Sequence, residues 1–247
     1  MPPQAHVRRP RRTSKELFRI LPLGDAAITI EFGNEIDPEI NARAIAFSKT
    51  IADQAWEGIL DVVPAYRSVT VSFDPLRWDS SVLTEKLRGL PRPKPHEHES
   101  HGTLHEIPVL YGDEWGPDLE AVAAFAGLTP AQVIELHTSI RYRVYMLGFS
   151  PGFPYLGIVP ERLAMPRRPT PRIKVPAGSV GIADRQTGIY PTTTPGGWRL
   201  IGRTPISLYR QSNAVPFLLK PGDMVQFKSI DHGEFDRLSR EGQGDDH

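Results

Sequence analysis

Short apolar runs and amphipathic stretches alternate along residues 17–90. Apolar side chains at positions 40, 44, 47 and 51 recur at spacings of four, three and four, which places them on one face of a helix. Asp37 followed by Pro38 is typical of the start of such a helix. The other predicted elements are strands over residues 26–32, 59–63 and 68–73 and a second helix over residues 80–87. Strands interleaved with two helices predict a small α+β N-terminal domain.

The pattern changes at residues 91–104, which are rich in proline and histidine. Alternating prolines end the preceding helix and favour an extended spacer, so we expect a linker here. Four of the eight histidines lie in or next to it, at positions 96, 98, 101 and 105. A metal site is the alternative interpretation, but a polar linker gives little support for fixed imidazole rings. We therefore expect no metal.

Residues 105–230 predict a second domain rich in β-structure. A strand over residues 106–111 precedes two short helices, one with Pro117 near its start and one with the capping-box pair Thr129 and Gln132. Short apolar pieces between turn signals then continue to about residue 227, a spacing typical of a closed barrel or sandwich. Residues 148–205 contain ten prolines and nine glycines, yet the apolar anchors among them indicate folded structure.

Composition and charge exclude several classes of protein. Lys plus Arg and Asp plus Glu both number 29, and a net charge of zero disfavours a nucleic-acid-binding role for the whole chain. The absence of cysteine excludes disulfides, thiolate catalysis and iron–sulfur clusters. No apolar run is long enough for a membrane span, and residues 1–16 form a basic tail without a signal-peptide core. Residues 231–247 are expected to be a frayed acidic tail, and the protein is expected in the cytoplasm.

Two motifs suggest chemistry that their context does not support. Gly148-Phe149-Ser150-Pro151-Gly152 matches the G-x-S-x-G pattern of a nucleophile elbow, but the residues that follow do not begin a helix. We interpret that match as accidental. Residues 176–181 contain glycines but lack the Gly-Lys-Ser/Thr ending of a phosphate-binding loop.

A basic segment stands out at residues 161–174, where four arginines and one lysine face a single acid. A solvated loop is the simplest interpretation of this surplus. An anion or carboxylate site is the alternative, because the arginine fork fits carboxylate and phosphate groups.

A long series of ordered motifs carries a family resemblance. It comprises Y-R-V-Y-M-L-G-F-S-P-G-F-P-Y-L-G from residue 142, P-R-R-P-T-P-R from 166, V-P-A-G-S-V-G-I-A from 175, Q-T-G-I-Y-P from 186, P-G-G-W from 195 and I-G-R-T-P from 201. In the first domain, G-D-A-A-I-T-I-E-F-G from residue 24 continues the series. The chain resembles the allophanate hydrolase subunit 1 family, which includes KipI and PxpB proteins, over about residues 21–227.

The resemblance implies a fold, a reaction and partners. The implied fold is an α+β protein, with a small α+β N-terminal domain followed by a cyclophilin-like β-barrel domain. The implied function is that of the B component of a 5-oxoprolinase, which uses ATP to open 5-oxoproline to glutamate together with a subunit 2 homologue of the KipA or PxpC kind and a third subunit.

Relatives leave two other functions open: inhibition of a histidine kinase, and the carboxyltransferase part of a biotin-dependent urea carboxylase. Fold alone does not decide between these functions. This chain has no biotinyl-lysine segment.

No catalytic residue follows from the sequence, but a candidate substrate pocket does. An amide or lactam substrate needs donors for a developing oxyanion and a clamp for a carboxylate. The candidate clamp residues are Arg143, Arg168, Arg172 and Arg203; the candidate donors are Tyr155, Ser179 and Tyr190; and the candidate apolar wall is Phe149, Phe153 and Trp198. For the aromatic residues, packing in the barrel core is an equally good interpretation.

Overall fold

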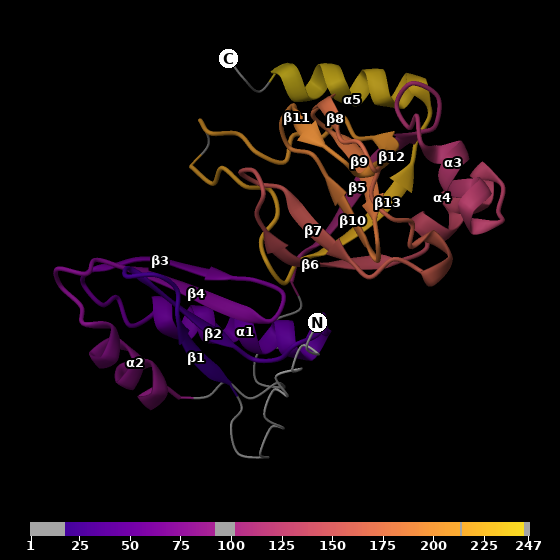
Figure 1. Ribbon diagram of the computed structural model, residues 1–247. Coiled ribbons are helices and arrows are strands. Elements are labelled where there is room, and N and C mark those ends of the chain that lie inside the picture. The colour runs from indigo at the N-terminus through magenta and orange to yellow at the C-terminus, as the bar shows by residue number, and fades with distance from the viewer. Residues whose placement is uncertain (1–17, 92–101, 213, 245–247) are drawn as a thin grey trace, which may run out of the picture. The chain divides into compact units, whose positions relative to one another are not determined.

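The computed structural model describes residues 18–91, 102–212 and 214–244. The chain divides between residues 94 and 95 into two compact units (Figure 1). The basic tail, most of the Pro/His-rich linker and the last three residues lie outside the described residues.

The first unit is a four-stranded antiparallel sheet with two helices, of which the residue pattern predicts both helices and three of the strands. Its strands are β1 (Arg19–Pro22), β2 (Ala27–Glu31), β3 (Ile59–Pro64) and β4 (Ser68–Phe73), in the spatial order β1-β2-β4-β3. Alternate residues of β2 and β4 are buried against apolar residues of helices α1 (Pro38–Ala52) and α2 (Ser80–Gly89). Asp37 Oδ1 caps α1 by accepting the backbone N–H groups of Glu39 and Ile40, both at 2.9 Å.

The second unit is built around a closed barrel of seven strands. In spatial order these are β10 (Gln186–Ile189), β7 (Pro154–Gly157), β6 (Arg141–Leu147), β13 (Met224–Ser229), β5 (Leu104–Tyr111), β12 (Arg199–Arg203) and β9 (Ser179–Ala183). Only β5 and β13 pair in parallel; every other neighbouring pair of the barrel is antiparallel. The expected α+β fold with a barrel domain is therefore confirmed.

Smaller elements surround the barrel. They are the helices α3 (Leu119–Ala126), α4 (Pro130–Thr138) and α5 (His232–Gly244), the short 3-10 helix η1 (Glu161–Leu163), and the two-stranded sheet of β8 (Arg172–Val175) and β11 (Thr194–Gly196). The predicted capping box at Thr129 and Gln132 is present. Within the described residues no single helix is long and apolar enough to span a membrane; α3 and α4, bent by 89°, pass that test only as a pair and only by length and composition.

Helix α5 corrects the expectation of a frayed acidic tail. It lies over one end of the barrel (Figure 1), and Phe235 is buried against the ring of Trp115 at a centroid distance of 4.9 Å. This buried aromatic side chain on a mostly polar segment supplies a tertiary contact that holds the helix.

A polar network stands inside the barrel core around the buried side chain of His137. Its Nδ1 lies 2.8 Å from the hydroxyl of Tyr111 and its Nε2 lies 3.0 Å from Thr187 Oγ1, which itself donates to Gly181 O at 3.0 Å. Because the Thr187 proton is used on that carbonyl, Nε2–H donates to Thr187 and Nδ1 accepts from Tyr111. Burial lowers the pKa of His137 to about 3, so the ring is neutral at pH 7. Both of its nitrogens have hydrogen-bond partners.

Candidate functional site

A cavity of about 250 Å³ lined by aromatic side chains lies beside the β8–β11 sheet. We call it the aromatic cavity. Its lining residues are Phe149, Phe153, Tyr155, Arg167, Pro171, Tyr190, Pro195, Gly196, Gly197 and Trp198. It therefore brings together five of the residues that the sequence analysis singled out, Phe149, Phe153, Tyr155, Tyr190 and Trp198.

The walls of the aromatic cavity are held by edge-to-face ring packing. The ring of Phe153 lies 5.1 Å from that of Tyr190 and 5.3 Å from that of Trp198, at interplanar angles of 78° and 84°. These three side chains are buried and form a small core cluster with Val175, Ala183 and Leu200. Edge-to-face packing of this kind fixes the rings. Phe153, Tyr190 and Trp198 thus belong both to the core and to the cavity wall.

Phe149 differs from the other rings because it is exposed and its backbone is strained. Its φ is +66°, a left-handed conformation that is costly for an aromatic residue, and its side chain is 63% exposed. It lies in the tight turn between β6 and β7, where Gly148 N–H donates to Phe153 O at 3.1 Å. Strand β7, not a helix, follows this turn, so the Ser150 motif lacks the strand-to-helix geometry of a nucleophile elbow.

Arg167 supplies the positive charge at the aromatic cavity. Its guanidinium carbon lies 5.9 Å from the ring centroid of Trp198, a cation–π distance. Among the described residues it has no carboxylate partner. Arg167 belongs to the basic segment of residues 161–174 but is not one of the predicted pocket residues. The local surplus of arginines was the signal that pointed to it.

The two tyrosines of the cavity remain protonated at neutral pH. Burial raises the pKa of Tyr190, against the lowering effects of the Trp198 backbone N–H and of the positive charge on Arg167. Burial likewise raises the pKa of Tyr155, with Arg167 again opposing. Both phenols therefore carry their proton, which is the form that can donate a hydrogen bond.

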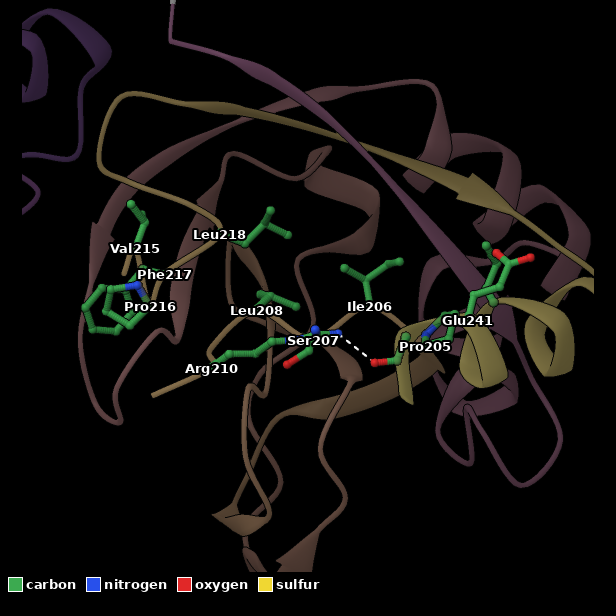
Figure 2. A pocket seen from close by; sticks show the side chains of 12 residues that line it. Pro205, Ile206, Ser207, Leu208, Arg210, Val215, Pro216, Phe217, Leu218 and Glu241 are labelled. Carbon is green, nitrogen blue, oxygen red and sulfur yellow. Dashed lines mark hydrogen bonds between the residues drawn. The ribbon is translucent and has the colours of Figure 1, made fainter. Parts of the chain in front are cut away.

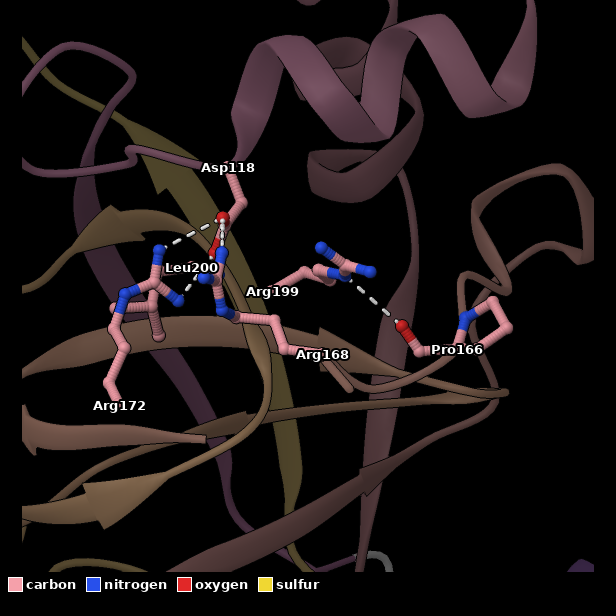
Figure 3. Close-up of polar contacts among 6 residues, drawn as sticks. All are labelled: Asp118, Pro166, Arg168, Arg172, Arg199 and Leu200. Carbon is pink, nitrogen blue, oxygen red and sulfur yellow. Dashed lines mark hydrogen bonds and ion pairs between the residues drawn. The ribbon is translucent and has the colours of Figure 1, made fainter. Parts of the chain in front are cut away.

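Arg168 and Arg172 share one buried carboxylate, that of Asp118 (Figure 3). Oδ1 of Asp118 accepts from Arg168 Nη1 at 3.0 Å and from Arg172 Nη2 at 2.9 Å, while Oδ2 lies 2.8 Å from Arg172 Nη1. Oδ2 also accepts the backbone N–H of Leu200 at 2.7 Å. The aspartate thus joins the start of α3, strand β12 and the basic segment, and the sequence analysis did not find it.

The ionised form of Asp118 is stabilised by its partners. Burial raises its pKa, but the hydrogen bonds from Arg172 and Leu200 and the charges of Arg172 and Arg168 outweigh burial and hold the pKa below the ordinary value. Two arginines and one aspartate leave a surplus of one positive charge. Through Arg168 and Arg172 the cluster ties the segment that carries Arg167 and Pro171 to Asp118.

The remaining candidates lie elsewhere. Arg203, at the end of β12, lines a second cavity of about 320 Å³ together with Trp115 and Arg210. Ser179 is buried at the start of β9, and Arg143 lies in the middle of β6, where burial lowers its pKa. Neither of these two side chains lines a cavity described here.

A larger apolar groove of about 560 Å³ lies between helix α5 and two stretches of chain, residues 205–210 and 215–218 (Figure 2). Arg210 crosses it and donates from Nη2 to Gly242 O of α5 at 2.8 Å. None of its lining residues is among the predicted pocket residues.

The described histidines do not form a metal site. The described residues contain no group of three or more His, Asp or Glu side chains placed to hold a metal ion. His105 Nε2 instead lies 3.2 Å from the buried carboxylate of Asp223. His96, His98 and His101 lie outside the described residues.

Comparison with known proteins assigns the chain to a family. Residues 18–219 match the carboxyltransferase domain, subdomains C and D. The chain belongs to this carboxyltransferase domain family. It is 41% identical over 238 residues to the B component of 5-oxoprolinase from Bacillus subtilis, covering 91% of this chain and 98% of that protein. It is 42% identical to the B component of 5-oxoprolinase from Escherichia coli O157:H7, covering 83% and 93%. The resemblance inferred from the motifs is therefore confirmed.

Solved structures also resemble this chain. The crystal structure of PH0987 from Pyrococcus horikoshii is 46% identical with a TM-score of 0.53, covering 88% of this chain and all of that one. TTHA0988 is 40% identical with a TM-score of 0.74 over 83% of this chain, which spans only 40% of the length of TTHA0988. Kluyveromyces lactis urea carboxylase, at 20% identity and a TM-score of 0.70 over 91% of this chain and 23% of its own, shares the fold.

Proposed function

We propose that this carboxyltransferase-family chain is the B component of an ATP-dependent 5-oxoprolinase of the cytoplasm. The observation that carries the proposal is 41% identity to the B component of a 5-oxoprolinase over 91% of this chain and 98% of that protein. In the proposed complex, a subunit 2 homologue and a third subunit complete the enzyme, and the complex consumes ATP. The chain by itself is not a self-sufficient hydrolase.

The aromatic cavity suits the proposed substrate by size and chemistry. 5-Oxoproline is a small five-membered lactam that carries one carboxylate. The rings of Phe153 and Trp198 offer a flat apolar wall for the lactam, and Arg167 offers a cation that no described carboxylate neutralises. We assign the substrate carboxylate to Arg167.

The ring-opening reaction defines what the remaining cavity groups do. One water adds across the lactam C–N bond: its oxygen stays on the carbonyl carbon, which becomes a carboxylate, and the ring nitrogen becomes the amine of glutamate. The carbonyl oxygen carries negative charge on the way, and neutral O–H donors stabilise it. Tyr155 and Tyr190, which burial keeps protonated, are the donors that we assign to this oxygen.

Reconstitution tests the proposal directly. The full chain is mixed with its subunit 2 and third-subunit homologues, and glutamate formation from 5-oxoproline is measured with and without ATP. We expect activity only with ATP and only when this chain is present. Absence of activity from an otherwise intact reconstitution would overturn the proposed function.

Two variants then test the assigned site. Arg167→Gln is expected to raise KM about tenfold or more, because it removes a charge-assisted contact to the carboxylate. Lys174→Gln is the matched control, since Lys174 is an exposed cation of the same segment that does not line the cavity. Equal KM values for the two variants would remove Arg167 from the site and leave the assignment of the chain to the complex intact.

A second function has one supporting observation. The chain is 24% identical to urea amidolyase of Saccharomyces cerevisiae over 88% of its own length and 14% of that protein. This function would be supported if the chain, mixed with a biotin carboxylase component, carboxylated urea and did not cleave 5-oxoproline. A third, histidine-kinase inhibition, predicts lower autophosphorylation of the kinase at saturating chain, and its absence would exclude that function.

A further inference from the structure

A second cavity, separate from the aromatic one, lies where helix α5 covers the end of strand β12. Trp115, Gly178, Arg203, Arg210 and Ser239 are among its lining residues, and its volume is about 320 Å³. We call it the Arg203 cavity. A volume of this size accommodates a small organic molecule rather than a bare ion.

The guanidinium of Arg203 is fixed in place but not neutralised. Its Nε donates to Ala177 O at 2.8 Å, and its Cζ lies 5.4 Å from the ring centroid of Trp115. No carboxylate among the described residues pairs with it, and partial burial lowers its pKa, as expected for a cation short of solvent and of a counter-charge. Its two terminal nitrogens thus keep the paired N–H groups that suit an oxoanion.

One lining residue of the same cavity, Trp115, holds a buried donor without an acceptor. Nε1 of Trp115 is inaccessible to solvent and has no hydrogen-bond partner among the described residues. Buried polar groups are almost always paired, so an unpaired indole N–H beside a guanidinium that has no described carboxylate partner indicates a missing acceptor. A negatively charged acceptor suits both groups best, because one of the two donors is a cation.

The remaining charges of the lining have the same sign. Arg210 brings a second guanidinium and is held to α5 by its bond to Gly242 O (Figure 2). None of the described lining residues is acidic, and Glu241 of the neighbouring groove is paired with Arg237 at 2.8 Å. We propose that the Arg203 cavity binds the carboxylate or phosphate group of a small organic molecule, through Arg203 and the indole N–H of Trp115.

Calorimetric titration of the full chain with two probes tests this site. Succinate represents carboxylates and inorganic phosphate represents phosphates, each titrated at constant ionic strength set with chloride. We expect saturable binding of one probe with a stoichiometry of one, and the probe that binds more tightly identifies the class of the anion. No saturable binding of either probe up to about 10 mM would overturn the proposal.

Variants locate the binding. Arg203→Gln is expected to weaken the affinity at least about tenfold, and Trp115→Phe, which keeps a ring under the guanidinium but removes the N–H, by about threefold or more. Arg185→Gln is the control, because Arg185 is exposed and lines neither cavity. The site would be refuted if the affinity for the anion probe were the same in Arg203→Gln, Trp115→Phe and the control Arg185→Gln.

Two further measurements show which cavity binds the anion and cover the case in which a variant does not fold. Arg167→Gln is expected to leave the affinity unchanged, since Arg167 belongs to the aromatic cavity; if it abolishes binding, the anion is bound there and the Arg203 cavity is excluded. If Arg203→Gln fails to fold by thermal unfolding, Trp115→Phe decides alone. Neither measurement depends on 5-oxoproline, so failure here leaves the proposed function standing.

Discussion

Replacing Asp118 with asparagine tests whether the buried carboxylate organises the basic segment. The substitution keeps the shape of the side chain but removes the charge that Arg168 and Arg172 share. Asparagine keeps one acceptor oxygen and points an N–H donor at groups that are themselves donors. One or two charge-assisted hydrogen bonds are lost, while the Leu200 N–H can keep its acceptor.

The magnitude follows from the burial of the three partners. The Asp118 side chain is 4% exposed, and those of Arg168 and Arg172 are 33% and 22% exposed, so water compensates the arginines only in part. At about 1.5–3 kcal/mol for each charge-assisted bond, we expect a loss of about 2–4 kcal/mol. In a unit of this size that lowers the melting temperature by roughly 5–15 °C.

Thermal unfolding at pH 7 measures the effect, with Glu106→Gln as the matched control. Glu106 forms an exposed pair with Lys228 at 2.6 Å, both side chains being more than half exposed, and we expect a loss of under about 1 kcal/mol there. In an Arg172→Gln background, Asp118→Asn is expected to cost less than in the wild type. If Asp118→Asn is as harmless as Glu106→Gln, the arginines do not depend on the aspartate and the reasoning fails.

The pH dependence gives a second check on the same residue. Because the folded pKa of Asp118 lies below its ordinary value of 3.8, its contribution is complete above that pH and is lost as the pH falls through the folded pKa. The difference between wild type and Asp118→Asn is therefore expected to be equal at pH 7 and pH 5. A difference that already shrinks between these values would contradict the lowered pKa.

Three other predictions concern the barrel unit. The pKa of His137 is about 3 in the folded protein against an ordinary 6.5, so its neutral ring contributes fully to stability above pH 6.5. The free energy of unfolding is expected to fall by about 2 kcal/mol between a pH above 6.5 and pH 5. Urea unfolding at these two pH values measures the fall, and an unchanged free energy would contradict the prediction. The Phe149→Gly variant is expected to melt at a higher temperature than Phe149→Ala, because only glycine adopts a φ of +66° without strain. The expected difference in stability between the two variants is about 1 kcal/mol. Gly196→Ala would place a Cβ in steric conflict with the hydroxyl of Tyr190 and is expected to cost about 1–3 kcal/mol of stability. Gly89→Ala is the control: it has open space around it and is expected to be neutral or stabilising in the same thermal assay.

The sequence predicted the helices of both units best, because their signals are local. Asp37 and Pro38 mark the start of α1, and Thr129 with Gln132 marks the start of α4; each cap is made by residues within three positions of one another. Strand β1 was missed because it is a four-residue strand at the edge of the sheet with little burial and no alternation to read. Helix α5 was missed because its partner, Trp115, is more than a hundred residues away.

At the candidate site, too, local sequence signals could be read, whereas contacts between distant residues could not. Phe149, Phe153, Tyr155, Tyr190 and Trp198 lie on turns and short strands of one proline- and glycine-rich stretch, so composition and motif order could group them before the fold was known. Their double role in core and cavity wall could not be foreseen, because the packing angles decide it. Arg143 and Ser179 were grouped with them by residue type alone, and strands β6 and β9 carry them away from the cavity.

The choice among arginines shows why charge counted along a sequence does not identify a binding residue. The basic segment carries a surplus of four positive charges over residues 161–174. Asp118, which lies 50 and 54 positions before Arg168 and Arg172, neutralises part of it through contacts made in the folded protein. Arg167, adjacent in sequence, is left without a described carboxylate and faces the aromatic cavity instead. Which arginine can bind an anion is therefore decided by a distant aspartate.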